Sequence, residues 1–254
     1  LHGGEINLRL PSVGATVNSI IMAASAEGET VIKGASREPH VKNLIDFKSI
    51  EDHDIKVGDY ITFGAYEQDN DSSNGREAIE WLVLDKKDDK LLVISKDVLD
   101  FKPFHRTAKW SITWVDCSLR KWLNDDFIDS AFSKKERELI SHAAVELWDK
   151  STTTDQVFCL SNEEARKYFS SDDARKSINT LYAEENGAHS DAWWLRSTGY
   201  GDASFVNRDG YICKNAELLD AGLSQEYLKL FGQGSNFNRP GVRPALWIDL
   251  SKVK

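Results

Sequence analysis

Two apolar, tryptophan-bearing segments near the C-terminal end constrain the fold of this chain more than any other feature. Trp193-Trp-Leu-Arg-Ser197 and Gly241-Val-Arg-Pro-Ala-Leu-Trp-Ile248 are both predicted to be buried strands. The segment between them is rich in Gly, Asn, Ser, Asp and Tyr, and is broken only by Phe205-Val206 and a short predicted helix, Ala216–Phe231. Rigid strands that hold a polar segment between them are a common way to build a binding surface.

The middle of the chain has the pattern of a compact α+β domain. Strands are predicted at Gly58–Gly64, Ile79–Leu84 and Leu91–Ser95, with a hairpin loop between the last two. Three helices are predicted to begin at capping boxes, in which a hydroxyl and an acid three residues later bond free backbone amides: Thr113–Asp116, Ser133–Glu136 and Ser161–Glu164. Apolar residues at helical spacing follow the first two boxes and are expected to face the core: Leu119, Trp122 and Leu123, then Leu139, Ile140 and Ala143.

Residues 1–47 form a separate segment with a βαβα pattern. Its predicted elements are a strand, a small-residue helix, a second strand and a second helix: Glu5–Leu10, Thr16–Ala26, Thr30–Lys33 and Glu38–Phe47. A segment of this length buries too little apolar surface to be stable alone. The polar stretch Lys48–Asp54 is predicted to be a linker, and residues 55–254 form the main domain.

Charge and hydropathy exclude several classes of partner. The net charge is −9 and no run of basic residues is present, which argues against nucleic acid as a partner. No apolar stretch approaches the roughly 20 residues that a membrane span needs. The start lacks the basic-then-apolar pattern of a signal peptide, so a cytoplasmic location is slightly favoured.

The residue types that carry metal or nucleophilic chemistry are scattered. Cys117, Cys159 and Cys213 lack C-x-x-C spacing and are predicted to be isolated buried thiols, with one disulfide as the alternative. The six histidines show no metal-ligand spacing and no nucleophile partner. The acidic pairs Asp125-Asp126 and Asp172-Asp173 are interpreted as solvated faces or helix caps, because adjacent carboxylates on a helix point apart. No catalytic residue, metal site or cofactor is predicted.

Large side chains in the two late strands are assigned to the scaffold. Trp193, Trp194 and Trp247 are expected to fill the core, since tryptophans inside apolar strands usually do so. Arg196 and Arg243 are expected to pair with carboxylates and brace the strands.

The first segment resembles a known enzyme family. Leu10-Pro-Ser-Val-Gly-Ala-Thr16, Ala26-Glu-Gly28, Thr30-Val-Ile32 and Ala35-Ser-Arg-Glu-Pro39 are similar to a stretch of UDP-N-acetylglucosamine enolpyruvyl transferase. The resemblance implies contact with the uridine nucleotide through Ser12, Val13 and Gly14. The family's catalytic cysteine lies upstream of the matched stretch and its second domain has no counterpart here. The resemblance therefore implies a relic or scaffold without transferase activity.

Residues 55–250 resemble a bacterial domain family of unknown function that is related to the C-type-lectin and formylglycine-generating-enzyme fold. The motifs that carry the resemblance occur in order: Gly58-Asp59, Ile79-Glu-Trp-Leu-Val-Leu84, Ser118-Leu-Arg-Lys-Trp-Leu-Asn124, Val157-Phe-Cys-Leu-Ser161, Trp193 to Ser197 and Gly241 to Trp247. It implies an α+β, C-type-lectin-like fold with short antiparallel strands, several helices and a long loop-rich C-terminal region. The calcium motifs of lectins with this fold do not occur, and of the late cysteine pair of the oxidising enzymes only Cys213 is present.

Some members of that family are variable proteins of diversity-generating retroelements. In those members a reverse transcriptase rewrites adenines in a C-terminal repeat, and substitutions collect on a binding face. The frame of such members resembles Trp193 to Ser197, Val206-Asn207, Gly210 and Gly241 to Leu246. Tyr offers rigid contact area, while Ser, Gly and Asn offer adaptable hydrogen bonds. The residues predicted as ligand contacts are Tyr200, Asp202, Ser204, Asn207, Arg208, Asp209, Tyr211, Asn236, Phe237 and Asn238.

The favoured interpretation is a binding module for an unknown protein or glycan, with a diversified C-terminal surface. A structural or assembly domain without such a surface is the first alternative, and a UDP-sugar-binding remnant of a cell-wall transferase is the second. The N-terminal segment offers a route to a homo-oligomer.

Overall fold

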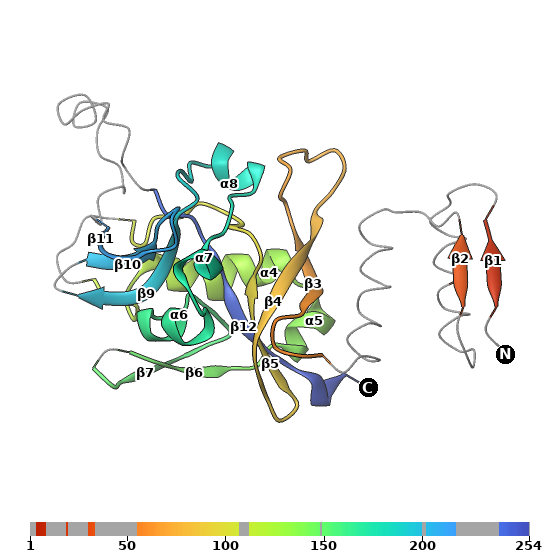
Figure 1. Cartoon of the computed structure of the whole chain (residues 1–254), viewed down its shortest axis with the longest axis horizontal. Coiled ribbons are helices and arrows are strands. Elements are labelled where there is room, and N and C mark those ends of the chain that lie inside the picture. The colour runs from red at the N-terminus through yellow and green to blue at the C-terminus, as the bar shows by residue number, and fades with distance from the viewer. Residues whose placement is uncertain are drawn as a thin grey trace.

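The protein is an α+β structure whose sheets are mostly antiparallel (Figure 1). The computed structural model describes residues 4–8, 19, 30–33, 55–106, 112–147, 149–199, 202–216 and 239–253. Within these ranges, no helix is both long enough and apolar enough to cross a bilayer. The predicted helices 16–26 and 38–47, the linker 48–54 and the predicted helix 216–231 lie almost wholly outside the described residues; Ser19 is helical, and residue 216 ends a strand.

A five-stranded sheet forms the centre of the main domain, in the order β3-β4-β5-β12-β8 with every pair antiparallel. Its strands are β3 (Tyr60–Tyr66), β4 (Glu77–Lys87), β5 (Lys90–Ser95), β12 (Ala245–Asp249) and β8 (Val157–Phe158). The predicted early strands are confirmed, with β3 two residues later than expected. Strand β5 lies between β4 and β12 and is buried at every residue except Lys90.

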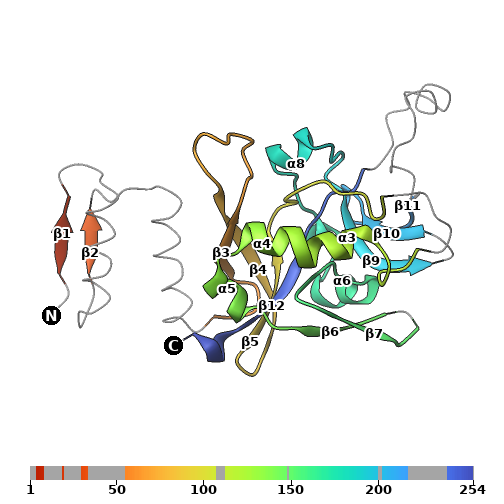
Figure 2. The same ribbon diagram turned by 180° about the vertical axis from the view of Figure 1, so that it is seen from behind.

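One helical rod lies across a face of this sheet (Figure 2). It consists of α3 (Ser118–Trp122), a π-helical turn (Leu123–Phe127) and α4 (Ile128–Ala131). The predicted core stripe is confirmed, because Leu119 and Leu123 are fully buried and Trp122 is nearly so.

The predicted start of this rod at Thr113 is wrong. Trp114 is 1% exposed, and its indole Nε1 donates to the Asp155 carboxylate at 2.9 Å. That anchor holds residues 114–116 in a turn, and the helix begins only at Ser118. The cap is Cys117, whose Sγ accepts from the backbone amide of Arg120 at 3.3 Å.

Asn124, within the π-helical turn, connects the rod to the edge of the sheet. Its side-chain oxygen accepts from the backbone amides of Gln156 and Val157, and its side-chain nitrogen donates to the carbonyl of Val157. Val157 begins β8, the last strand of the sheet. Asn124 therefore satisfies backbone groups at a sheet edge, which would otherwise be open to pairing.

The other helices are short and capped by hydroxyls. Both remaining capping boxes are confirmed: Ser133 and Glu136 begin α5 (Lys134–Leu139), and Ser161 and Glu164 begin α6 (Asn162–Tyr168). The continuation of the first of these helices to Ala143 is wrong, because Ala143 opens a strand. The remaining elements of this region are β6 (Ala143–Glu146), β7 (Thr152–Asp155), α7 (Asp172–Arg175) and α8 (Leu181–Glu185).

The second sheet carries the C-terminal motifs. It is antiparallel, in the order β11-β10-β9, and contains β9 (Trp193–Gly199), β10 (Asp202–Val206) and β11 (Ile212–Ala216). The two late tryptophan-bearing segments therefore lie in different sheets. Gly241 joins them: its amide donates to Ala192 at 2.8 Å and its carbonyl accepts from Trp194 at 3.0 Å.

The N-terminal strands are confirmed as a pair. β1 (Glu5–Asn7) and β2 (Val31–Lys33) are parallel, as a βαβ connection requires. The carbonyl of Lys33 accepts from Leu8 at 2.9 Å, so the pairing extends one residue beyond β1.

We predict that Gly210 is required for stability. It has φ +85, and an alanine Cβ there would lie 1.8 Å from the carbonyl oxygen of Asp172. Gly58 has a similar φ of +96 with no atom within 4 Å of an added Cβ, so Gly58→Ala is a matched control for backbone strain alone. We expect Gly58→Ala to lower the free energy of unfolding by about 1 kcal/mol and Gly210→Ala by at least about 3 kcal/mol. Urea denaturation measures both, and equal losses would contradict the packing argument.

Candidate functional site

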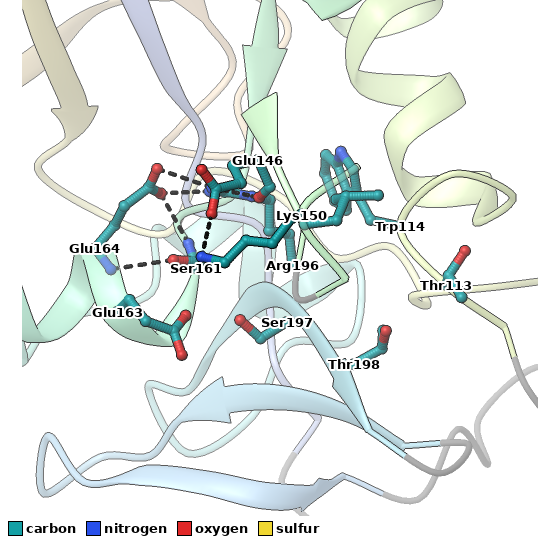
Figure 3. A pocket seen from close by; sticks show the side chains of 11 residues that line it. Thr113, Trp114, Glu146, Lys150, Ser161, Glu163, Glu164, Arg196, Ser197 and Thr198 are labelled. Carbon is teal, nitrogen blue, oxygen red and sulfur yellow. Dashed lines mark hydrogen bonds and ion pairs between the residues drawn. The ribbon is translucent and has the colours of Figure 1, made fainter. Parts of the chain in front are cut away.

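An open pocket of about 350 Å³ lies at the end of β9. Figure 3 shows side chains from four parts of the chain converging on it. Ser197 and Thr198 come from β9, Ser161, Glu163 and Glu164 from the start of α6, Glu146, Leu147 and Lys150 from the β6–β7 hairpin, and Thr113 and Trp114 from the turn before α3. The volume falls at the lower end of the range of small-molecule sites.

Arg196 braces one wall of this pocket and has no donor to spare. Its two terminal nitrogens bind both carboxylate oxygens of Glu164, one at 2.8 Å. Its remaining N–H groups donate to the carbonyl of Cys159 at 2.9 Å and to the carbonyl of Glu146 at 3.2 and 3.3 Å. All five guanidinium hydrogens are therefore used, and the predicted role of Arg196 as a carboxylate-paired brace is confirmed.

A second ion pair lies on the exposed rim. Lys150 bonds Glu146 at 2.6 Å, and this contact raises the pKa of the lysine ammonium. Both side chains are largely exposed, so water screens the pair and it adds little stability.

Four polar groups remain open to a ligand. Glu163 is exposed, and among the described residues it makes no hydrogen bond or ion pair. The hydroxyls of Thr113 and Thr198 are likewise uncommitted within those ranges. Ser197 Oγ accepts from the amide of Asn162 at 2.9 Å, which leaves its own proton to donate.

Four of the residues predicted to contact a ligand lie after β10, at the end of the three-stranded sheet opposite the pocket. The side-chain oxygen of Asn207 accepts from the amides of Asp209 and Tyr211, and so fixes the β10–β11 turn. Arg208 and Asp209 are exposed, and Tyr211 is 57% exposed. The turn is held against α7, because Arg175 Nε donates to the carbonyl of Gly210 at 2.9 Å.

The predicted ligand contacts are therefore not one continuous surface. Asp202 pairs with Gly199 at the pocket end of the sheet, whereas Arg208, Asp209 and Tyr211 lie at the other end. Tyr200, Asn236, Phe237, Asn238, Ser12, Val13 and Gly14 lie outside the described residues, as does the side chain of Asp202.

The predicted surface position of Ser204 is wrong. Its side chain is 4% exposed and accepts a hydrogen bond from Asn162 at 3.2 Å. Strand alternation explains the error: β10 is covered on both faces, so Ser204 and Phe205 are both buried although their side chains point in opposite directions.

Two further scaffold predictions need correction in part. Trp193 and Trp194 are buried as expected, while Trp247 is only partly buried. Arg243 does not bind a carboxylate: it donates to the carbonyls of Ser95 and Arg175. Its charge lies 5.0 Å from the centre of the Trp193 ring. Burial lowers the pKa of Arg243 to about 10, which still leaves it charged at neutral pH.

The cysteines and the aspartate pairs take structural roles. All three thiols are free, but Cys213 is only half-buried, which corrects the prediction for that residue. Burial raises the pKa of Cys117 to about 12 and also raises that of Cys159, so neither is a thiolate at neutral pH. Of the aspartates, Asp125 pairs with Lys121, Asp172 with Arg175 and Asp173 with Lys176.

One group of carboxylates has the spacing of a cation site. Oxygens of Glu67, Asp69 and Glu77 lie within 4.8 Å of one another. Glu77 already accepts from the amide of Gln68 at 2.7 Å, and Glu67 accepts from that of Asp71 at 3.0 Å. The hydrogen bonds of the loop therefore account for the cluster.

The pocket itself was not predicted from the sequence. Its free groups lie beside motifs that were identified, since Glu163 sits inside a capping box and Thr198 directly follows the first late tryptophan-bearing segment, which ends at Ser197. The sequence of the β6–β7 hairpin has no strong strand pattern, so the hairpin was not predicted. Its residues Glu146, Leu147 and Lys150 form part of the pocket lining.

Part of the chain is similar to UDP-N-acetylglucosamine 1-carboxyvinyltransferases. It is 47% identical to that of Lactobacillus acidophilus over 47 residues, which are 18% of this chain and 11% of the relative. It is 48% identical to that of Clostridium acetobutylicum over 56 residues, 22% of this chain and 13% of the relative. The similar stretch is N-terminal, so the chain spans only a small part of these relatives. No solved structure matches the chain.

A family model matches a later and longer part of the chain. The model described as Domain of unknown function (DUF6273) matches residues 88–250, which include the pocket and both ends of the three-stranded sheet. Because the match extends over more than half of the 254 residues, the chain belongs to this family.

Proposed function

We propose that this chain is a C-type-lectin-like binding module for a protein or glycan, and that it binds rather than transforms its ligand. The observation that carries the proposal is the pocket at the end of β9. One wall is held by the saturated Arg196–Glu164 pair, while Glu163 and the hydroxyls of Thr113 and Thr198 stay uncommitted among the described residues and Ser197 keeps a proton to donate. A rigid base with spare polar groups is suited to orient a ligand.

The residues that line this pocket also support binding over catalysis. The described lining contains neither a histidine nor a cysteine. A serine or threonine nucleophile needs a neighbouring base. Of the three acids in the lining, Glu146 and Glu164 are already paired with cations, and Glu163 makes no hydrogen bond to a lining hydroxyl among the described residues.

The distribution of burial supports a diversified surface. The frame residues Trp193, Val206 and Leu246 have no exposed area, and Gly210 packs against α7. Between them, Arg208, Asp209 and Tyr211 face solvent. Substitutions at such exposed positions change stability little, so they can vary while the frame stays constant.

A UDP-sugar-binding remnant is the second candidate, favoured by the N-terminal similarity to UDP-N-acetylglucosamine 1-carboxyvinyltransferases. In this proposal Ser12, Val13 and Gly14 would contact the nucleotide. A structural or assembly domain is the remaining alternative, and it requires no ligand at either end of the sheet.

The binding proposal predicts selective retention on arrays. We expect the labelled full chain to bind a discrete subset of an immobilised glycan and peptide array. Thr198→Val at the pocket or Tyr211→Ala at the turn should weaken that binding at least about fivefold, the effect of losing one important contact. Tyr60→Ala is the matched control, because Tyr60 is 56% exposed and lies on β3. No retention, or an equal loss from Tyr60→Ala, would favour the structural domain.

Diversification predicts a second copy of the coding repeat. We expect DNA beside the gene to contain a near-identical template for the region from residue 193 to residue 246, differing at adenine positions. Differences should fall at codons for Arg208, Asp209 and Tyr211 and spare the codon for Gly210. Sequencing of the flanking DNA checks this, and a template that differs equally at all bases would contradict it.

The UDP-sugar candidate predicts a thermal shift. A ligand that binds only the folded state raises stability by RT ln(1 + [L]/Kd), which is about 2.7 kcal/mol at a hundredfold excess over Kd. We expect UDP-N-acetylglucosamine to raise the melting temperature of the full chain if this candidate is right, and Gly14→Val to abolish the rise. An unchanged melting temperature at millimolar ligand removes the candidate.

A further inference from the structure

Each of the four pocket groups can accept a hydrogen bond from a ligand, although the three hydroxyls can also donate one. Glu163 can only accept, and the hydroxyls of Thr113, Ser197 and Thr198 each offer oxygen lone pairs. An ammonium carries three donors and a guanidinium five, and neither accepts. Such a cation satisfies one carboxylate and several hydroxyl oxygens at once.

The net charge of the pocket lining also favours a cationic ligand. Its lining carries three carboxylates, from Glu146, Glu163 and Glu164, against two cations, Lys150 and Arg196, which leaves one net negative charge. Lys150 is held by Glu146 at 2.6 Å, and Glu163 influences it only at longer range. Arg196 has no free donor for an anion. An anion would therefore find only the exposed ammonium of Lys150 to bind it, in a lining whose net charge is negative.

The described pocket lining offers no accessible aromatic ring on which a sugar could stack. Pyranose rings commonly stack on an accessible aromatic face, and the indole of Trp114 is 1% exposed with its Nε1 donated to Asp155. No other aromatic ring belongs to the described lining. A neutral sugar would be bound only through hydrogen bonds of its own hydroxyls, without stacking on an aromatic ring.

We infer that this pocket takes the cationic head of a lysine or arginine side chain presented by a protein partner. The inference rests on the proposed binding function and names the ligand class of that site. Glu163 binds the cation, the hydroxyls of Thr113, Ser197 and Thr198 are the acceptors available for its remaining hydrogens, and the Arg196–Glu164 pair holds the wall in place. The partner's side chain enters through the open mouth beside the β6–β7 hairpin, where Lys150 and Glu146 form the rim (Figure 3).

Three small probes separate the alternatives on the full-length, isotope-labelled chain. N-acetyl-lysine methylamide carries the ammonium, its norleucine analogue has a neutral side chain of similar length, and N-acetylglucosamine represents a sugar. Backbone amide shifts of Ser197 and Thr198 in nuclear magnetic resonance spectra report occupancy of the pocket. We expect saturable shifts with the lysine probe alone, weakening as salt is raised, because salt screens ionic contacts. The arginine counterpart of the probe should act in the same way.

Glu163→Gln should weaken the lysine probe at least about fivefold, the result of losing one charged contact. Glu184→Gln is the matched control, since Glu163 and Glu184 are both exposed acids in the first turn of a short helix. Equal binding of the norleucine probe, or no effect of Glu163→Gln, would overturn the inference. Shifts caused by the sugar alone would overturn the inference of a cationic ligand and leave the proposed binding function intact. If none of the probes shifts these amides, the result counts against both the inference and the proposed binding function.

Discussion

The guanidinium of Arg196 is the contact on which the rest of the C-terminal architecture depends. It extends from β9 and binds Glu164 of α6, the carbonyl of Cys159 and the carbonyl of Glu146 in the hairpin. The side chain is 2% exposed and Glu164 is 30% exposed. Removing one partner of a buried pair costs roughly 3–5 kcal/mol, a large share of the roughly 5–15 kcal/mol that stabilises a domain. Three of the four segments that line the pocket, namely β9, α6 and the β6–β7 hairpin, are thus joined by one side chain.

Arg243 fixes the opposite end of the same sheet by a different route. It donates to Ser95 on β5 and to the carbonyl of Arg175 at the end of α7, and it lies against the ring of Trp193. Arg175 in turn donates to Gly210 in the β10–β11 turn. Two arginines therefore connect the three-stranded sheet to the five-stranded sheet and the helices, and neither end of β9 is free to move independently.

The sequence predicted local patterns well and spatial convergence poorly. The capping boxes at Ser133 and Ser161 and the stripe of Leu119, Trp122 and Leu123 follow from spacing within one turn or two, and the structure confirms them. The start at Thr113 failed because a tertiary contact of Trp114 with Asp155, 41 positions away, outweighed a local capping preference.

At the candidate site, too, local features were predictable from the sequence and long-range contacts were not. That Arg196 would meet a carboxylate was foreseeable from a charged residue within an apolar strand, but its partner could not be named from one sequence. Ser204 was misplaced because alternation predicts which face a side chain occupies without saying whether that face is covered. In this sheet both faces of β10 are covered, so a polar residue is buried and bonds Asn162. The pocket needs four separate segments, and no spacing rule relates Thr113 to Thr198.

The division between committed and uncommitted polar groups gives the clearest physical basis for a binding role. Groups that hold the scaffold are saturated, as Arg196 is, and a substitution there leaves buried partners unsatisfied. Groups that face the pocket or solvent, such as Glu163, Thr198 and Tyr211, contribute little to the packing of the core. In the proposed binding module, specificity and stability would therefore be set by different residues, and the ligand could change through substitutions that the fold tolerates.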